Sequence, residues 1–191
     1  PRFKIVDNTQ KKYALQNIVE AIKDSNADDN DVVILLDGDD WLSNPNVLAN
    51  LNKHYSNPDC YLTYGSYVMY PHGVRGIEPS EYPQEVVKKN AFRKDQWRAS
   101  HLRTFKYKLW KHLDVKDLQD DNGSYYKMTY DQAIMLPLLE MAGNRSKYIN
   151  DIMHVYNKQN PLSVDKIKAQ EQHQLMLDIR NKKSYSRLKR I

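Results

Sequence analysis

Apolar and polar residues are arranged along the chain in blocks that predict helices and strands in turn. Apolar residues recur with helical spacing at positions 14, 18, 21 and 22, which predicts a helix with one apolar face. Residues 32–36 form an unbroken apolar run, the pattern of a strand covered on both faces in a parallel sheet. Ahead of the helix, residues 3–6 are predicted to form a short strand.

The later part of the chain repeats this alternation. Ser43-Asn44-Pro45 combines a capping residue with a proline at the first helical position, which predicts a helix that continues to Tyr55. The remaining predictions are strands at 61–64 and 67–70 separated by Gly65, a helix over 103–113, a helix from Thr129 or Tyr130 to Met141 stopped by Gly143, and short strands near Tyr148 and at 152–156. Alternating helices and strands predict an α/β fold.

The charge of the chain is unevenly distributed. The whole chain has 29 basic and 24 acidic residues, a net charge of +5, which first suggests a nucleic-acid partner. Residues 166–191 contain eight basic and two acidic residues, so this tail carries +6 and the rest carries −1. We therefore expect no nucleic-acid partner. An amphipathic basic helix in the tail is instead suited to docking on a membrane surface or on a protein.

The overall composition is that of a soluble globular protein. Hydrophobic residues make up 40% of the 191 residues, enough for one sizeable core. No apolar run approaches the roughly 20 residues of a membrane-spanning helix. Cys60 has no second cysteine with which to form an internal disulfide, which fits a reducing compartment. These features predict a cytoplasmic protein.

Three carboxylates follow the apolar run at residues 32–36, as Asp37-Gly38-Asp39-Asp40. Ligands of open α/β sheets bind outside the carboxyl ends of the strands. Carboxylates crowded on one turn repel each other unless a cation neutralises them, and Mg²⁺ and Mn²⁺ prefer oxygen ligands. A divalent-cation site is one interpretation of this motif, and a solvated acidic turn is the other.

The order of these motifs resembles the nucleotide-sugar glycosyltransferases of the A-type (GT-A) fold, specifically the family-2 group. In that family a helix with an alanine and an asparagine precedes a buried strand that ends in Asp-x-Asp. The same order is present here as Tyr13-Ala14-Leu15-Gln16-Asn17, residues 32–36 and residues 37–40. A later family motif, an acidic residue that opens a helix ending in glycine, is similar to Asp131-Gln132-Ala133 with Gly143.

The resemblance covers about residues 5–160 and implies a Rossmann-type central mixed sheet flanked by helices. It divides the chain into a glycosyltransferase-like domain at 1–165 and the helical basic tail at 166–191. It also implies an enzyme that moves a sugar from a nucleotide-diphosphate sugar, with a UDP-sugar expected first, to the hydroxyl of an unidentified acceptor with inversion. The alternative is a non-catalytic binding or regulatory module on a truncated scaffold.

The resemblance assigns roles to individual carboxylates. Asp39 would hold Mn²⁺ (or Mg²⁺) at the donor diphosphate, Asp37 would contact either this metal or the nucleotide ribose, and Asp40 would face the donor sugar. Asn17 belongs to the same nucleotide-sugar site. Asp131 would be the general base, and a carboxylate in the first turn of a helix is stabilised as the anion that a base must be. The alternative for Asp131 is an ordinary acidic residue near a helix start.

Residues 96–103 mix aromatic, cationic and imidazole groups. We expect Trp97 to stack on a sugar face, and Arg98, His101 and Arg103 to hold the leaving diphosphate. A plain surface helix start is the competing interpretation. His154 lies in a strand-like run and is predicted to be a core or edge histidine rather than a metal ligand.

The chain also departs from the family pattern. Many family members have a glycine where Lys11 or Lys12 stands, and a histidine or arginine in the segment that is 157–161 here, so a third metal ligand is not predicted. Only 36 residues precede Asp37, fewer than the strand–helix–strand units that hold the nucleotide base in the family. We therefore expect an incomplete base-binding region, with the chain alone inactive if that region is essential.

Overall fold

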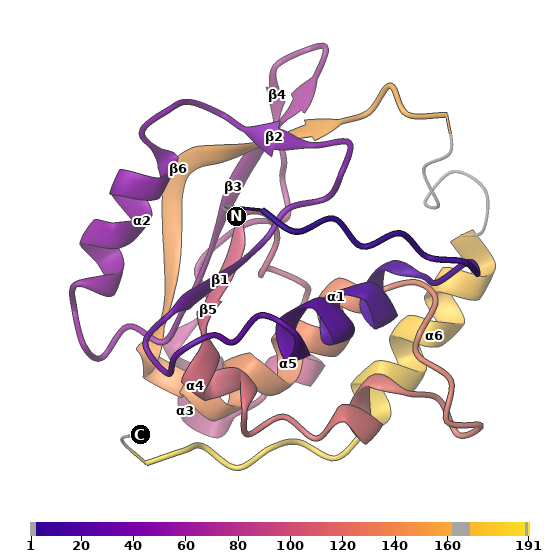
Figure 1. The fold of residues 1–191 in the computed structure, drawn as a ribbon. Helices are drawn as coiled ribbons and strands as arrows, with labels where there is room; N and C mark the ends of the chain where they lie inside the picture. Colours follow the sequence, from indigo (N-terminus) through magenta and orange to yellow (C-terminus); the bar gives the residue numbers. More distant parts are fainter. Residues whose placement is uncertain (1–2, 162–168, 190) are drawn as a thin grey trace.

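The computed structural model describes residues 3–161, 169–189 and 191. It is a mixed α/β structure in which a curled mixed sheet is flanked by helices (Figure 1). The strands are β1 (Val32–Leu35), β2 (Trp41–Leu42), β3 (Leu62–Tyr70), β4 (Val74–Arg75), β5 (Arg103–Lys106) and β6 (Ser146–Asn157). The α-helices are α1 (Ala14–Lys23), α2 (Val47–Tyr55), α3 (Gln84–Lys89), α4 (Tyr107–Trp110), α5 (Tyr130–Ala142) and α6 (Ala169–Asn181). Short 3₁₀ helices are η1 (Phe92–Lys94), η2 (Val115–Leu118) and η3 (Gly143–Arg145).

Within the described residues, the strands form a six-stranded sheet in the order β1-β5-β3-β6-β2, with β4 paired to β3. The pairing of β3 with β6 is parallel, and the pairings of β1 with β5, β5 with β3 and β6 with β2 are antiparallel. The sheet is therefore mixed, as the sequence predicted. The carboxyl end of β1 leads directly into the loop that contains Asp37 and Asp39.

The prediction of a parallel setting for β1 was wrong, because β1 pairs antiparallel with β5. Its side chains make core contacts on both faces, but Val32, Val33 and Ile34 are only half-buried. Val33 and Leu35 pack in the main core, whereas Val32 and Ile34 pack against the smaller core cluster that includes residues of α2. The unbroken apolar run therefore indicated apolar contacts on both faces of the strand, but it did not indicate whether the neighbouring strand is parallel or antiparallel.

The predicted helix over 103–113 was also wrong in its first part. Residues Arg103–Lys106 form β5, a central strand between β1 and β3, and only the following turn, Tyr107–Trp110, is helical. All four residues of β5 are buried. Pairing with two neighbouring strands overrides a helical spacing that rests on few apolar residues.

Two pairs of predicted short strands are single long strands in the structure. β3 runs through Gly65, and its register with β6 shifts on either side of Ser66. Gly65 suits this irregular pairing, because an added Cβ would lie 3.0 Å from the carbonyl oxygen of Ile149. Residues 3–6, predicted as a strand, are extended and outside any strand.

The main core forms around α5, whose residues 132–142 are all buried. Gly143 ends this helix at positive φ, as predicted. α6 packs against the same core through Ile179, which is 1% exposed. The following segment is held by hydrogen bonds from Leu188 N to Met141 O and from Tyr185 N to Glu140 Oε2. The described part of the predicted basic tail thus lies against the body, and the tail residues 166–168 and 190 lie outside the described residues.

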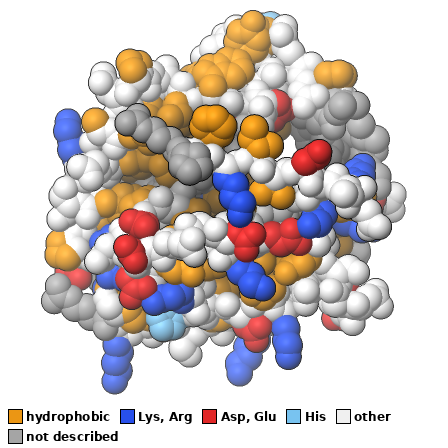
Figure 2. Space-filling model, in the orientation of Figure 1, with side chains coloured by type: hydrophobic (Ala, Val, Ile, Leu, Met, Phe, Trp, Pro, Cys, Tyr) orange, Lys and Arg blue, Asp and Glu red, His pale blue; other side chains and the backbone are white. Residues whose placement is uncertain are grey.

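The surface matches the near-neutral charge of the body. On the face seen in Figure 2, charged side chains of both signs are interspersed across the lower half, and apolar side chains gather in the upper half. This face has no continuous basic patch among the described residues. None of the helices in the described part of the chain is both long enough and apolar enough to cross a membrane.

Candidate functional site

A pocket of about 290 Å³ opens where the loop after β1 meets β5 and the start of α5. Its polar lining brings together four groups that the sequence singled out separately, Asp37, His101, Arg103 and Asp131. The other lining residues are Tyr13, Ala14, Lys127, Met128, Thr129, Tyr130, Tyr156 and Gln172. Asp37 and Asp131 are far apart in the sequence, so their meeting is a result of the fold.

Arg103 lies between the two carboxylates. Its side chain is 3% exposed, and its Nη2 and Nη1 atoms lie 3.6 Å from Asp37 Oδ2 and from Asp131 Oδ2. Nη2 also donates to the hydroxyl of Tyr130 at 3.3 Å and to Nδ1 of His101 at 3.1 Å. The Nε of Arg103 is buried and has no hydrogen-bond partner among the described residues. One guanidinium therefore links every charged group of the pocket except Lys127.

Tyr130 ties the loop after β1 to the start of α5. Its hydroxyl donates a hydrogen bond to Asp37 Oδ1, and its ring lies under the guanidinium of Arg103 with 5.3 Å to the ring centroid. Burial raises the pKa of Tyr130, so the phenol stays protonated and remains a donor. The sequence marked Tyr130 only as a helix start, and its position beside Asp131 was the available signal.

The start of α5 presents Asp131 to the pocket in a constrained conformation. Thr129, the residue before the helix, adopts the left-handed region with φ 58°, which is unusual for a β-branched residue. Its hydroxyl donates to the carbonyl oxygen of Gln172 in α6 at 3.4 Å. α6 thus contributes to the pocket both as lining and as support for the turn that positions Asp131.

The electrostatics of the pocket favour a proton acceptor at Asp131. Burial raises the pKa of its carboxyl above the ordinary value, and the positive charge of Arg103 opposes that rise. Burial alone would lower the pKa of Arg103, but Tyr130, Asp131 and Asp37 raise it overall, so the guanidinium is charged. A carboxylate with a raised pKa accepts a proton more readily than a solvated one.

His101 is a neutral hydrogen-bond donor in this setting. Burial, Arg103 and His154 lower its pKa well below the usual value. Since Arg103 can only donate, Nδ1 of His101 accepts, which places the ring proton on Nε2. His101 can therefore donate one hydrogen bond to a ligand, but as a neutral ring it supplies no positive charge to a diphosphate.

Asp39 is the most exposed carboxylate of the loop after β1. It is exposed, with one hydrogen bond from Asn160 Nδ2 to Oδ2 at 2.6 Å, whereas Asp37 is already engaged by Tyr130 and Arg103. Gly38 between them leaves open space, since an added Cβ would meet nothing within 4 Å. Carboxylate oxygens beside an open position fit Mn²⁺ or Mg²⁺.

The structure gives Asp40 a different role from the predicted contact with a sugar. Asp40 is buried and accepts from the backbone N–H of Asn157 and from Nε2 of His154, both at 2.8 Å. His154 is fully buried, as predicted for a core histidine, but its Nδ1 has no partner in the described part of the chain. The pair attaches the loop after β1 to β6.

Asp40, His154 and His101 also form a group whose ligand atoms lie within 4.8 Å of one another. Such a group could in principle hold a metal. However, both oxygens of Asp40 are hydrogen-bonded, and the guanidinium of Arg103 donates to His101. A cation there would be repelled by the buried positive charge of Arg103.

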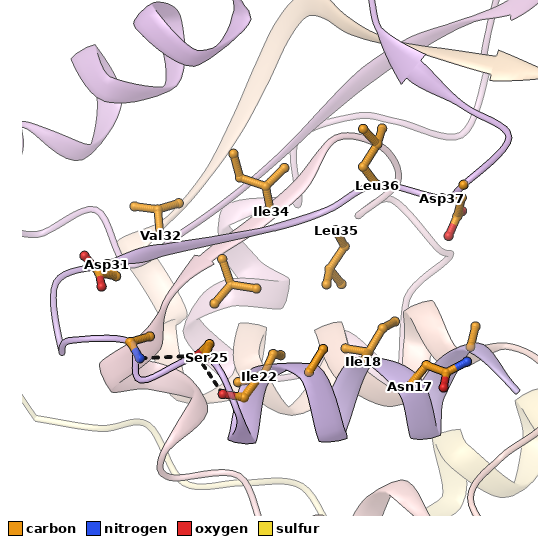
Figure 3. Close-up of a pocket in the computed structure, with 15 residues that line it drawn as sticks. Asn17, Ile18, Ile22, Ser25, Asp31, Val32, Ile34, Leu35, Leu36 and Asp37 are labelled. Atoms are coloured by element: carbon orange, nitrogen blue, oxygen red, sulfur yellow. Dashed lines mark hydrogen bonds between the residues drawn. The ribbon is translucent and has the colours of Figure 1, made fainter. Parts of the chain in front are cut away.

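The other predicted site residues lie in two different places. Asn17 and Asp37 line a larger hollow of about 740 Å³ between α1 and β1 (Figure 3). Both residues lie at the end of this hollow where the loop after β1 begins. Trp97 and Arg98 are not among the described residues that line the pocket at Arg103. Trp97 packs against the main core, and Arg98 pairs with Asp95 at 2.7 Å and lies over the ring of Tyr82.

No protein-family model matches this chain, and no curated protein sequence matches it. The resemblance to family-2 glycosyltransferases therefore rests on the sequence motifs alone.

Proposed function

We propose that this chain is a metal-dependent glycosyltransferase that acts on a nucleotide-diphosphate sugar through the pocket at Arg103. One observation carries the proposal. Asp37, the first carboxylate of the loop after β1, and Asp131, at the acidic start of α5, come from the two family motifs, line one pocket and contact the same arginine. A GT-A-type arrangement of the sheet is part of the proposal.

The proposed chemistry divides the carboxylates by their environment. Asp39, exposed beside open space at Gly38, would hold Mn²⁺ or Mg²⁺ with help from Asp37. The bound cation would supply neutralising charge to the donor diphosphate. Asp37 is less available as a ligand, because Tyr130 donates to it and Arg103 lies 3.6 Å away.

Asp131 would act as the general base. It takes the proton from the acceptor hydroxyl while that oxygen forms a bond to the anomeric carbon, and the bond from the anomeric carbon to the diphosphate breaks. The nucleoside diphosphate leaves with the bonding electrons, and the configuration is inverted. The raised pKa of Asp131 supports this role, and nearby Arg103 keeps the carboxyl from becoming neutral too easily.

Arg103 would be a positioning residue rather than the predicted direct ligand of the diphosphate. Its guanidinium is buried and directed at two carboxylates, one from each half of the site. Fixing these two groups relative to each other is what a transfer between a donor and an acceptor requires. His101 Nε2 remains as a hydrogen-bond donor toward the pocket.

The test uses Mn²⁺-dependent release of UDP from a panel of UDP-sugars, with and without simple sugar acceptors. We expect release by the wild-type chain and a loss of about 10²–10⁴-fold in Asp131→Asn, the usual contribution of general-base catalysis. Glu85→Gln, in an exposed ion pair of α3, is the matched control and should be fully active. Turnover unaffected by Asp131→Asn would contradict the assignment of the base.

A further inference from the structure

Among the described residues, no strand pairs with the outer edge of β1. Asp31 O accepts from Tyr107 N, so the carbonyl of Asp31 points toward the strand that contains β5, while its N–H donates to Asp28 O. Opposed residues of an antiparallel pair alternate between hydrogen-bonded and non-hydrogen-bonded, so Val33 and Leu35 also face β5. The N–H and C=O groups of Val32 and Ile34 therefore point outward, where no strand of the described residues pairs with them.

This free edge borders the hollow of about 740 Å³ between β1 and α1 (Figure 3). Its walls are largely apolar, with Ile18, Ala21 and Ile22 on α1 facing the strand. Leu36, just after β1, is 44% exposed. An apolar edge strand beside an apolar hollow is a site that attracts another extended segment.

An extended apolar segment of the same chain lies next to this site. Phe3, Ile5 and Val6 are 78%, 83% and 58% exposed, so the segment 3–6 has the composition of a strand without the burial of one. Both ends of the stretch are attached to α1. Lys4 Nζ lies 3.7 Å from Asp24 Oδ2 beyond the end of the helix, and four residues later Asn8 Nδ2 donates to Asn17 Oδ1 at 2.9 Å.

These two attachments give the segment a direction. Figure 3 shows that α1 and β1 run side by side in opposite directions, with Asn17 and Asp37 at one end of the hollow and Ser25 and Asp31 at the other. A stretch that passes from Asp24 to Asn17 therefore runs parallel to β1. Its reach also fits, since four extended residues span about 13 Å and seven helical residues about 10 Å.

We propose that residues 3–6 dock as an added parallel strand on the outer edge of β1 and cover the hollow against α1. The strand, α1 and β1 would then form a β-α-β unit, the usual connection between adjacent parallel strands. This inference does not depend on the proposed enzymatic activity. Charge as well as shape favours residues 3–6 as the occupant of the hollow, because Lys4 lies beside Asp24 at the acidic end of the hollow.

A second copy of the chain suits the edge less well. Two β1 strands paired antiparallel across their outer edges would place Asp31 of one copy near Asp37 of the other. Like charges opposite each other destabilise a strand pair. The basic segment 3–6 has no such conflict with the acidic ends of β1.

The test is amide hydrogen exchange, measured by NMR on the whole chain. We expect the outward N–H of Ile34 to exchange about tenfold or more slowly in the wild type than in Ile5→Asp, which blocks apolar docking. Ile77→Asp changes an isoleucine that is 91% exposed in a loop and should leave the rate as in the wild type. Equal, fast exchange in all three proteins would overturn the proposal.

A cysteine pair distinguishes docking within one chain from pairing between copies. In a Cys60→Ala background, Ile5→Cys with Ile34→Cys should form a monomeric disulfide under mild oxidation with diamide, whereas Ile77→Cys with Ile34→Cys should not. A disulfide found only in dimers, together with protection of Ile34 that depends on protein concentration, would also overturn the proposal, because the occupant would then be a second copy.

Discussion

Arg93 and Arg103 are both buried, yet their surroundings differ in a way that separates structure from chemistry. Arg93 makes a closed pair with Glu140, with Nε to Oε1 at 2.7 Å and Nη2 to Oε2 at 3.1 Å, and its Nη1 donates to Ile179 O at 2.6 Å. Arg103 lies 3.6 Å from each of two carboxylates, and its Nε has no partner among the described residues.

The difference shows how the geometry of an ion pair that stabilises the fold differs from that of an ion pair in a functional site. The pair of Arg93 and Glu140 is bidentate and buried. Together with the bond from Arg93 to Ile179 O it connects η1, α5 and α6, and so holds the C-terminal helix against the body. The contacts of Arg103 are longer and open into a pocket, which leaves the carboxylates able to accept another hydrogen bond or a proton. A buried donor without a partner is costly, and such cost is tolerated where a site has another use.

Breaking the closed pair should have the largest effect on stability. Arg93→Met leaves the fully buried carboxylate of Glu140 with one hydrogen-bond donor among the described residues, the backbone N–H of Tyr185 at 3.0 Å. We expect a loss of about 3–5 kcal/mol in the free energy of unfolding, measured by urea denaturation. Glu85→Gln, in an exposed pair with Lys89, should change the stability by about 0.5 kcal/mol or less. Equal losses in the two variants would contradict the comparison.

Removing the open arginine should cost less. In Arg103→Met, Asp37 keeps its hydrogen bond from Tyr130, and Asp131, which is only partly buried, can take up water or a proton. We expect a loss of about 1–3 kcal/mol. The pKa of Asp131, followed by NMR titration of its carboxyl carbon, should rise further in the variant, because the positive charge of Arg103 lowers this pKa in the wild type. A loss as large as that of Arg93→Met, with an unchanged pKa, would make Arg103 a purely structural residue.

The raised pKa of Asp131 predicts a pH dependence of stability with a definite sign. A carboxyl whose pKa is higher in the folded state contributes stability below its unfolded value of 3.8, and this contribution is lost as the pH rises through the folded value. Asp131→Asn removes the effect. The free energy of unfolding of the variant minus that of the wild type should therefore increase with pH above about 4 and then level off. A difference that falls with pH would show that the carboxyl is stabilised as the anion instead.

The smallest effect is expected at the pair of Asp40 and His154. His154→Asn keeps a side-chain donor for Asp40 but shortens its reach, and we expect a loss of about 1–2 kcal/mol. Mn²⁺ binding, followed by paramagnetic broadening of NMR signals, should be unchanged if Asp39 holds the cation. Loss of Mn²⁺ binding in His154→Asn, with binding retained in Asp39→Ala, would move the metal site to the group of Asp40, His101 and His154.

Sequence patterns predicted the local elements of the site well. The predicted start at Thr129 or Tyr130 and the stop signal at Gly143 located α5 almost to the residue, and the run at 32–36 located β1 with its carboxylates at the carboxyl end. Each of these signals is carried by neighbours in the sequence, through helical spacing, a terminal glycine or an apolar run. The mixed α/β fold follows from the order of these elements.

What the sequence did not predict depends on pairing over long distances. The segment Arg103–Lys106 has apolar neighbours compatible with a helix, and only its two strand neighbours make it β5. The same cause explains Arg103 itself, which was predicted to bind a diphosphate and is instead aimed at carboxylates from two other elements. Asp40 likewise found a partner in β6, more than a hundred residues away.

Binding of Mn²⁺ and UDP tests the central claim most directly. Broadening of NMR signals by Mn²⁺, recorded with and without UDP on the whole chain, reports which residues lie near the ion. We predict that signals of Gly38 and Asp39 broaden, that those of Asp131 follow when UDP is added, and that Asp39→Ala abolishes both effects while Asp131→Asn retains them. Broadening that persists in Asp39→Ala, or that never includes the residues after β1, would contradict a metal-dependent site shared by Asp39 and Asp131.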